Sequence, residues 1–323
     1  MKVNSVLDLI GNTPLVKLER IIDKEYANEY ANIYAKIESM NLTGSMKARS
    51  ALGMIKAAEE RGELKPGYTI IESTSGNLGY ALAAIGKLKG YDVIVVIDPK
   101  TDELKRNILK AYGAKLVIVK KADERGAYQP ARIKKVQQLL KKIPNSWCPM
   151  QYESIDNLMA HYKTTGPEIY EEMEGKIDVL IGAVGTCGHL GGSAKYLKEK
   201  IPNLRVIGVE PDGSVLSGGE YHPYLVQGPG LSFIPKNLDR NVIEKIVKVS
   251  DEDAFYTARK LAKTEALLMG GSSGAVVHTA LKVAKEIGPG KNIVTILGDD
   301  GFRYAMNFYD DNWLVTHKIQ PPE

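Results

Sequence analysis

Lys47 lies near the start of a predicted helix, where a lysine is unusual. Within residues 41–62, Thr43, Gly44 and Ser45 have the turn and capping chemistry that precedes a helix, and apolar residues then recur at helical spacing. The unpaired amides at a helix N-terminus carry a partial positive charge that disfavours an ammonium group. This field and partial burial both lower a lysine pKa, and a neutral amine can form a Schiff base with an aldehyde. Lys47 is therefore a candidate nucleophile, although a lone lysine in a helix is more often an ordinary surface residue.

Three glycine-containing turns precede predicted helices. ESTSGNLG (72–79) and AVGTCGHLGG (183–192) each follow a predicted strand, and GGSSGA (270–275) lies between two predicted helices. Ligands of open α/β sheets bind where strands end in such turns. Each turn offers backbone N–H groups at a helix N-terminus, which favours an anion. The second turn is thus a candidate site for the phosphate of an aldehyde cofactor that Lys47 could bind.

Short apolar segments alternate with amphipathic segments along most of the chain. This alternation predicts an α/β fold with mostly parallel sheets that helices cover on both faces. The predicted strands are residues 68–73, 92–98, 115–119, 178–184, 204–210 and 292–298. The predicted helices are residues 78–89, 103–112, 129–142, 187–200, 252–268 and 273–286. Residues 211–238, rich in glycine, proline and tyrosine, are predicted to form a long irregular loop.

Length, charge and cysteine content exclude several classes of protein. The 323 residues suffice for two domains or one large α/β unit, and the net charge is only +4. No basic segment is interleaved with aromatic residues, so we expect no nucleic-acid partner. Cys148 and Cys187 have no metal-ligand spacing, which argues against a zinc site or a disulfide framework and for a reducing compartment. The apolar runs are too short for a signal peptide or a membrane span, so we expect a cytoplasmic protein without membrane contact.

Short motifs in a fixed order along the whole chain resemble one family of enzymes. They resemble the cysteine synthase and cystathionine β-synthase family of fold-type II pyridoxal-phosphate (PLP) enzymes, also called β-substituted alanine synthases. The motifs are IGNTPLVKL (10–18), GSMKAR (44–49), STSGNLG (73–79), QY (151–152), TTGPEI (164–169), the glycine loop at 185–192, GPGLSFIPKNLD (228–239), GSSGA (271–275) and the C-terminal ILGDDGFRY. The resemblance covers essentially the entire sequence.

The resemblance implies a fold like that of the tryptophan synthase β-subunit, with two parallel-sheet lobes that carry helices on both faces. Residues 46–152 would form a smaller, mobile lobe that binds the substrate. Residues 1–45 and 153–323 would form a larger lobe that binds the cofactor. The resemblance also implies pyridoxal 5'-phosphate as the cofactor, small amino-acid substrates and a homodimer.

The resemblance also implies roles for individual residues. Lys47 would form the Schiff base with the cofactor and then remove the α-proton of the substrate. Asn77 would hydrogen-bond the ring oxygen of the cofactor, and the neutral hydroxyl of Ser272 would face the pyridine nitrogen, which suits β-elimination better than transamination. The residues implied for the cofactor phosphate are Gly185, Thr186, Cys187, Gly188 and His189. The residues implied for the substrate carboxylate are Thr74, Ser75, Gly76 and Gln151.

Two residues depart from the phosphate loop of the family, which usually reads GTGGT where this chain reads GTCGH. Cys187 replaces a glycine, and we expect this to be tolerated if its φ angle is negative. His189 replaces a threonine hydroxyl by a larger donor whose charge depends on pH, so we expect the backbone to make the main contacts. No acid–base partner accompanies Cys187 in the sequence, so we do not expect it to be a nucleophile.

The implied reaction is β-replacement on an O-activated L-serine, either O-phosphoserine or O-acetylserine, through an aminoacrylate. Sulfide as the nucleophile would give L-cysteine. One alternative is a lyase that releases sulfide from cysteine, and another is a non-catalytic relative that binds a protein or a metabolite. A nicotinamide-dependent dehydrogenase is a further alternative, because a glycine turn at 185–192 follows one strand and Glu210 ends the next. Lys47 and Asn77 argue against that last class.

Some segments are more similar to the N-(2-amino-2-carboxyethyl)-L-glutamate synthase branch, which uses O-phosphoserine and glutamate. These segments are residues 71–79, 95–100, 128–140 and 309–314. Arg132 would suit a phosphate or a second carboxylate. Further substrate contacts are expected from Tyr152, Gly228 and Ser232. Gly185 stands where that branch is expected to have a serine, so the nucleophile stays open between sulfide and glutamate.

Overall fold

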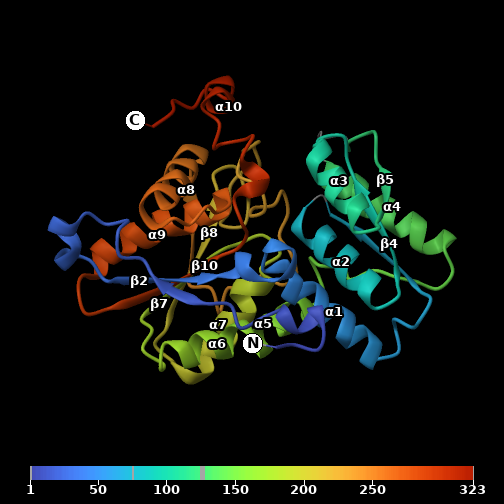
Figure 1. Cartoon of the computed structure of the whole chain (residues 1–323), viewed down its shortest axis with the longest axis horizontal. Coiled ribbons are helices and arrows are strands. Elements are labelled where there is room, and N and C mark those ends of the chain that lie inside the picture. Colours follow the sequence, from blue (N-terminus) through green and yellow to red (C-terminus); the bar gives the residue numbers. More distant parts are fainter. Residues whose placement is uncertain (1, 75, 124–127, 323) are drawn as a thin grey trace.

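The computed structural model describes residues 2–74, 76–123 and 128–322, and it contains two sheets with helices around them (Figure 1). Every strand and helix predicted from the sequence is present, with ends that differ by no more than three residues. The strands are β1 (Leu15–Lys17), β2 (Asn32–Ile37), β3 (Thr69–Ser73), β4 (Asp92–Ile97), β5 (Lys115–Ile118), β6 (Ser146–Trp147), β7 (Val179–Ala183), β8 (Arg205–Pro211), β9 (Lys245–Val249) and β10 (Asn292–Leu297). The helices are α1 (Lys47–Glu60), α2 (Asn77–Leu88), α3 (Glu103–Ala111), α4 (Tyr128–Lys142), α5 (Ile155–Lys163), α6 (Thr165–Glu172), α7 (Gly188–Lys200), α8 (Asp251–Glu265), α9 (Gly271–Ile287) and α10 (Asp311–Thr316).

The smaller sheet has four parallel strands in the order β5-β4-β3-β6. Alternate residues of a strand face opposite sides of the sheet. Ile70 and Val95 pack with α1 and α2, whereas Ile71 and Val96 pack with Val136 of α4. Both faces are therefore buried, which confirms the predicted parallel sheet with helices on each side.

The larger sheet has six strands in the order β1-β2-β10-β7-β8-β9. All neighbours are parallel except β1, which runs antiparallel to β2 at one edge and was not predicted. Ile181 and Val209 face a core formed with α8 and α9. Leu180 and Val206 face the opposite core, formed with α6 and α7. This sheet, too, has helices on both faces, and the predicted α/β architecture is confirmed.

The two sheets come from different parts of the chain. All strands of the smaller sheet lie between residues 69 and 147, and those of the larger sheet come from residues 15–37 and 179–297. In Figure 1 the smaller sheet with α2, α3 and α4 lies on the right, the larger sheet on the left, and α1 between them. The division into a mobile lobe of residues 46–152 and a larger lobe stays a prediction, and its boundaries cut neither sheet.

Helices α5, α6 and α10 and the strands β2, β6 and β9 were not predicted. Glycines explain how α5 packs. Gly166 and Pro167 lie in the first turn of α6, where a proline disrupts no intrahelical hydrogen bond. Helix α7 approaches α5 closely at Gly188 and Gly192. A Cβ on Gly192 would lie 2.1 Å from the carbonyl oxygen of Leu158, so the two backbones nearly touch.

Outside the two sheets, we examined the chain for membrane-spanning helices, metal sites, disulfides and the predicted long loop. Within residues 2–74, 76–123 and 128–322, no helix is long and apolar enough to cross a membrane, and no cluster of side chains has the make-up of a metal site. Cys148 and Cys187 are free thiols. The predicted irregular loop is confirmed, since neither helix nor strand lies between β8 and β9 in this described part of the chain.

We expect Gly192→Ala to destabilise the fold, because the new methyl group meets backbone atoms that cannot move aside. It would lie 2.1 Å from the carbonyl oxygen of Leu158 and 2.9 Å from the amide nitrogen of Tyr162. Overpacking of this kind lowers the unfolding free energy by about 1–3 kcal/mol. Gly191→Ala is the matched control, because its methyl group would come no closer than 3.4 Å to Leu158. Urea unfolding measures both variants, and equal losses of stability would contradict this account of the packing.

Candidate functional site

Lys47 is the first residue of α1, and the segment after β10 fixes the backbone beside it. The amide of Met46 donates to the carbonyl oxygen of Gly298 (2.9 Å), and the amide of Asp300 donates to that of Gly44 (3.2 Å). Gly44 has a φ angle of 72°, and a Cβ there would lie 2.2 Å from Asp300 Oδ2, so this position requires glycine. The start of α1 is therefore held by the end of the larger sheet.

The turn before α1 differs from the predicted one. Residues Leu42–Gly44 form a 3₁₀ turn, and the N-cap residue is Met46, which makes no side-chain cap bond. The prediction that Thr43 and Ser45 cap the helix is wrong. Backbone pairing with residues 298–300 takes the place of a side-chain cap, which a local sequence pattern cannot reveal.

The amine of Lys47 has an unusually low pKa. Burial lowers the pKa to about 8, while the nearby Cys187 and Asp299 act in the opposite direction. The Nζ atom lies 3.5 Å from the hydroxyl of Thr186. The lowered pKa agrees with the sequence prediction, with burial as its main cause, and the contact places the amine beside the glycine loop.

The glycine loop between β7 and α7 ends at a helix N-terminus. Helix α7 begins at Gly188, and the amide of Gly191 donates to the carbonyl oxygen of Cys187 (2.9 Å). The amides of the first turn have no partner inside the helix and can bind an anion. A Cβ on Gly188 would lie 2.4 Å from Asn157 Oδ1, so glycine is required here as well. This geometry supports phosphate binding by the backbone of residues 185–189.

Cys187 does not have the expected backbone conformation. Its φ and ψ angles are 61° and 2°, in the left-handed region that favours glycine, so the negative φ named as the condition for tolerating a cysteine is not met. The side chain is fully buried, and its thiol donates to the carbonyl oxygen of Gly185 (3.4 Å). Burial raises the pKa of Cys187 to about 12. The thiol therefore stays protonated near neutral pH and is no nucleophile.

The imidazole of His189 lies against β7 and a second histidine. A Cβ on Gly182 would be 3.3 Å from His189 Nε2, and the rings of His189 and His161 meet edge to face with centroids 6.1 Å apart. Burial, together with the charge of Lys47, lowers the pKa of His189 to about 3. The ring is neutral at physiological pH, so the charge change considered for it does not arise there. Its backbone amide is the group that can contact a phosphate.

The predicted substrate turn follows β3 directly. The amide of Thr74 donates to the carbonyl oxygen of Val96 (3.3 Å), and the amide of Gly76 donates to the Thr74 hydroxyl (3.5 Å). A Cβ on Gly76 would have no atom within 4 Å, so this residue borders open space. Ser75 lies outside the described residues. The turn thus offers a hydroxyl and backbone groups at the carboxyl end of β3.

Gln151 lies beside this turn and is held by four hydrogen bonds. Its Nε2 donates to the carbonyl oxygen of Ser73 (3.2 Å), and its amide donates to Glu72 Oε2 (3.2 Å). Its carbonyl oxygen accepts from Asn157 Nδ2 (2.9 Å) and Asn237 Nδ2 (3.2 Å). The structure therefore brings Gln151 and the turn after β3 together, although they are far apart in sequence.

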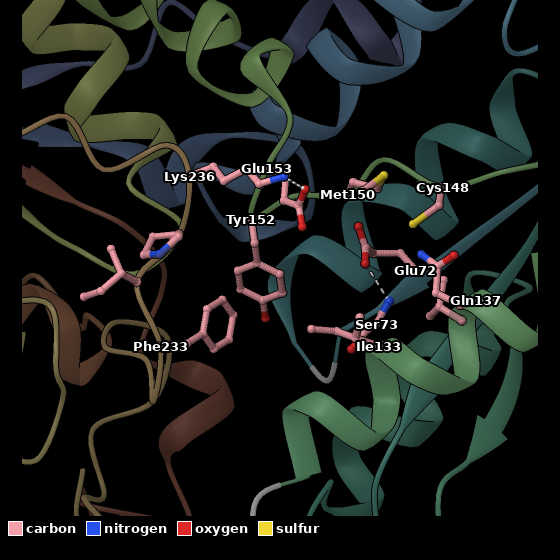
Figure 2. A pocket seen from close by; sticks show the side chains of 13 residues that line it. Glu72, Ser73, Ile133, Gln137, Cys148, Met150, Tyr152, Glu153, Phe233 and Lys236 are labelled. Carbon is pink, nitrogen blue, oxygen red and sulfur yellow. Dashed lines mark hydrogen bonds and ion pairs between the residues drawn. The ribbon is translucent and has the colours of Figure 1, made fainter. Parts of the chain in front are cut away.

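A cavity of about 190 Å³ continues from these segments, between the smaller sheet and residues 233–236 (Figure 2). Glu72 and Ser73 line it from β3, and Tyr152 meets Phe233 edge to face with ring centroids 5.3 Å apart. Burial raises the pKa of Glu72 to about 7. The cavity is largely apolar with an acidic wall, next to the predicted substrate residues.

Arg132 of α4 is buried and already paired. Its Nη1 lies 3.0 Å from Asp98 Oδ2, and both side chains are less than a tenth exposed. Its charge also acts on Glu72 and Tyr152, which places it near the cavity. Asp98 compensates part of the charge, whereas Nε and Nη1 of Arg132 are buried without a hydrogen-bond partner among the described residues. A substrate anion that bound them would have to share the guanidinium with a carboxylate.

The loop with Gly228 and Ser232 packs on the glycine loop. The amide of Gly230 donates to the carbonyl oxygen of Val184 (2.7 Å), and a Cβ on Gly185 would lie 3.2 Å from the carbonyl oxygen of Gly228. Ser232 is partly exposed. The loop therefore borders the predicted phosphate site, and Gly185 has little room for a side chain.

Asn77 and Ser272 converge on the segment after β10. Asn77 begins α2, and its Nδ2 donates to Asp299 Oδ2 (2.7 Å), while Arg303 Nη1 donates to Asn77 Oδ1. A Cβ on Gly298 would lie 3.9 Å from the Ser272 hydroxyl. Since Gly298 also accepts from Met46, residues beside Lys47, Asn77 and Ser272 all meet at residues 298–299.

Sequence reasoning missed Asn157, Asp299 and Arg303. Asn157 is 1% exposed, and its Nδ2 donates to the Thr186 hydroxyl (3.2 Å) as well as to Gln151. A polar residue on the buried face of α5 is a signal that could have singled it out. Asp299 and Arg303 follow the carboxyl end of β10, where ligand contacts concentrate in α/β folds.

Glu210, the acidic residue considered for a dehydrogenase, is engaged in hydrogen bonds within the protein. Its carboxylate accepts from the amides of Leu216 and Ser217, both at 2.9 Å, and from the Ser217 hydroxyl. A carboxylate that organises the loop after β8 in this way is not presented to a ribose.

Comparison with known proteins gives the family. Residues 6–299 match the protein family described as "Pyridoxal-phosphate dependent enzyme". The chain belongs to this family. It is 42% identical over 305 residues to a cysteine synthase of Staphylococcus aureus (strain Mu50 / ATCC 700699). This alignment covers 94% of the present chain and 95% of that protein. It is 44% identical over 323 residues to a cystathionine beta-synthase of Apis mellifera, and this alignment covers 98% of the present chain and 63% of that protein.

Two solved structures have a similar fold. A hydrogen sulfide-producing enzyme from Fusobacterium nucleatum superposes with a TM-score of 0.87 at 38% identity, over 94% of this chain and all of that one. An O-acetylserine-dependent cystathionine beta-synthase from Helicobacter pylori superposes with a TM-score of 0.86 at 38% identity, over 95% of this chain and 98% of that one. The protein is therefore a PLP-dependent enzyme of the cysteine synthase and cystathionine β-synthase group, with a fold-type II architecture.

The residues of the site fit this cofactor. The low-pKa amine of Lys47 suits the aldehyde, and the first turn of α7 suits the phosphate. The Oδ1 atoms of Asn157 and Asp299 are buried and have no hydrogen-bond partner among the described residues, so the site holds unsatisfied polar atoms. Ser272 adds a hydroxyl near Gly298.

We expect Asn157→Ala to lower the unfolding free energy by about 1–3 kcal/mol, because Gln151 and Thr186 lose a buried donor. Cofactor binding should weaken too, since Thr186 lies in the glycine loop. Asn107→Ala on the exposed side of α3 is the control and should change stability by less than about 0.5 kcal/mol. Urea unfolding and the dissociation constant of PLP test this. Equal behaviour of the two variants would show that Asn157 does not organise the site.

Proposed function

We propose that this protein catalyses β-replacement on an O-activated L-serine, with sulfide as the nucleophile and L-cysteine as the product. The observation that carries the proposal is the Lys47 amine, with its pKa of about 8, 3.5 Å from the Thr186 hydroxyl of the glycine loop. When bound, PLP supplies an aldehyde for this amine and an electron sink for the substrate carbon that loses its proton.

Each side chain of the site has a role in this proposal. Lys47 would hold the cofactor aldehyde, and its neutral amine would take the α-proton of the substrate. Thr74, Gly76, Gln151 and their neighbour Ser75 hold the substrate carboxylate. Closure around the substrate carboxylate next to Gly76, which borders open space, would exclude water from the reacting atoms.

The surroundings of the cofactor ring support elimination and replacement. Ser272, proposed to face the ring nitrogen, offers a neutral hydroxyl in place of a carboxylate, and this hydroxyl lies near Gly298. A hydroxyl leaves the ring nitrogen less protonated than a carboxylate does, so the ring is a weaker electron sink. This favours loss of a β-substituent over transamination.

Sulfide is favoured over glutamate as the nucleophile. Glutamate brings two carboxylates, whereas the cation proposed for them, Arg132, is paired with Asp98, and the cavity wall includes Glu72. A serine at position 185 would also press on Gly228, because even a Cβ there lies 3.2 Å from its carbonyl oxygen. Sulfide needs neither an anion anchor nor extra room.

The same arguments favour O-acetylserine over O-phosphoserine, since the phosphate also requires a free cation. Release of sulfide from cysteine is a second candidate reaction. It is supported by the similarity to the Fusobacterium nucleatum structure, which is described as a hydrogen sulfide-producing enzyme. Both reactions remove a β-substituent from a bound L-amino acid. Cysteine synthesis removes acetate from O-acetylserine and adds sulfide, whereas the lyase removes sulfide from cysteine.

The experiment that tests the proposal is a visible spectrum of the holoenzyme followed by product analysis. O-acetylserine should change the cofactor spectrum, and added sulfide should restore it and yield L-cysteine. O-phosphoserine and glutamate serve as the competing pair of substrates. If O-phosphoserine with glutamate gives the faster reaction, the glutamate branch replaces this proposal. Sulfide release from cysteine alone, without cysteine synthesis, would favour the lyase.

The lowered pKa of Lys47 predicts how cofactor capture depends on pH. At pH 7 an amine with a pKa of about 8 is about one tenth neutral, against roughly 1 in 2,500 for an ordinary lysine. Because only the neutral amine attacks the aldehyde, capture of PLP by the apoprotein should speed up as the pH rises through 8 and level off above about pH 9. Borohydride trapping followed by mass analysis measures the rate. Lys47→Arg is the control and should trap no cofactor, and a rate that climbs steadily to pH 10 would contradict a lowered pKa.

A further inference from the structure

Both ends of the Asn77 side-chain amide are held by residues that follow β10. An asparagine amide has one acceptor oxygen and two N–H donors. One N–H of Asn77 points to Asp299 Oδ2 at 2.7 Å, and the Asn77 oxygen accepts from Arg303 Nη1. A carboxylate and a guanidinium thus engage the two ends of one neutral amide.

Arg303 is itself fixed in place. Its Nη2 donates to the carbonyl oxygen of Thr43 (3.1 Å) and forms an ion pair with Asp300. The guanidinium also lies over the ring of Tyr80, 5.4 Å from its centroid. These contacts leave the Nη1 group aimed at Asn77, so the cation cannot swing away without breaking several interactions.

Asp299 is equally constrained. It is 4% exposed, accepts from the Tyr304 hydroxyl at 2.8 Å, and forms an isolated β-bridge with Ser45. Its Oδ2 therefore serves both Tyr304 and Asn77. The carboxylate has a fixed direction from which it can accept an N–H but repels a carbonyl oxygen.

These two charges decide which way the amide points. Turning the Asn77 amide over would place its oxygen against Asp299 and its NH₂ group against Arg303, and both contacts would be repulsive. In the observed orientation one N–H is used by Asp299, and the second has no hydrogen-bond partner among the described residues. Without these two charges the Asn77 amide could turn over, and its oxygen would face the cofactor about as often as its nitrogen.

We propose that Asp299 and Arg303 are positioning residues that lock the Asn77 amide with its nitrogen as the donor to the ring oxygen of the cofactor. The inference rests on the role of Asn77 in the proposed function. It adds that the hydrogen bond from Asn77 to the ring oxygen depends on Asp299 and Arg303, which are not proposed to contact the cofactor themselves. It also assigns a use to the acidic pair and the arginine in the GDDGFR segment, residues 298–303.

The lock also joins the two sheets at the site. Asn77 begins the helix after β3 of the smaller sheet, whereas Asp299 and Arg303 follow β10 of the larger sheet. The same segment pairs with the backbone before Lys47. The nucleophilic amine and the ring-oxygen donor are therefore aligned by one stretch of chain.

A double-mutant cycle on the holoenzyme tests this proposal. The variants are Asn77→Ala, Arg303→Met and the pair together, and the readouts are the visible absorption band of the bound cofactor and the dissociation constant of PLP. Asn77→Ala should shift the band and weaken binding by about tenfold, which corresponds to one hydrogen bond. Arg303→Met should shift the band in the same direction. In the Asn77→Ala background, Arg303→Met should cause no further shift, because its effect acts through Asn77.

Arg259→Met is the matched control. Arg259 also bonds a backbone carbonyl, that of Phe308, and an aspartate, Asp311, in the C-terminal segment, but it does not contact Asn77. It should leave the cofactor band unchanged. If Arg303→Met behaves like Arg259→Met while Asn77→Ala shifts the band, the lock does not exist. Additive shifts in the double variant would likewise overturn it.

Asp299→Asn keeps the shape of the side chain and guards against a misfolded Arg303 variant. It should shift the band as Arg303→Met does and should be silent in the Asn77→Ala background. None of these readouts needs a substrate. A protein that passes them yet makes no cysteine would overturn the proposed reaction alone, whereas an unchanged band in Asn77→Ala would remove the cofactor contact on which the lock depends.

Discussion

The backbone pairing between residues 44–46 and 298–300 is the constraint on which the rest of the site depends. It ties the start of α1 to the carboxyl end of β10, the central strand next to β7. Through Asp299 it also reaches Asn77 at the start of α2. The site is thus assembled by a short non-local contact between the larger sheet and the helix that follows β2. Gly44 makes the contact possible, because any Cβ there would collide with Asp300.

The charge balance around Lys47 follows from this arrangement. Two unit charges about 4 Å apart at an effective dielectric constant of about 20 attract by roughly 4 kcal/mol, enough to keep a lysine fully protonated. Asp299 is close enough to raise the Lys47 pKa, yet burial still prevails. The carboxylate of Asp299 is engaged by Asn77 and Tyr304, and Arg303 lies near it. Its field is therefore largely compensated before it reaches the amine.

The fold could be predicted well from the sequence, and the site only in part. The alternation of buried strands and helices is a local pattern, and β3, β4, β7, β8 and β10 all follow it. The family motifs located the segments that the structure gathers around Lys47. What the sequence could not supply were contacts between distant segments, such as the bond from Asn157 to Thr186 or the pairing of Arg132 with Asp98. Burial that depends on such contacts sets the size of the pKa shifts. The sequence therefore predicted the direction of the Lys47 shift but not the lowered pKa of His189 or the raised pKa of Cys187.

The unusual residues of the phosphate loop illustrate how such contacts allow a departure from the family pattern. A non-glycine residue in the left-handed region costs roughly 1–2 kcal/mol. The Cys187 side chain is fully buried in the core between the larger sheet, α6 and α7, where a small apolar side chain is stabilised. The His189 ring likewise packs against β7 and His161, as a neutral group. Both side chains therefore point to the interior. The departures from the family pattern lie on the face that packs on the protein, and they leave the backbone amides at the start of α7 available for the proposed phosphate contact.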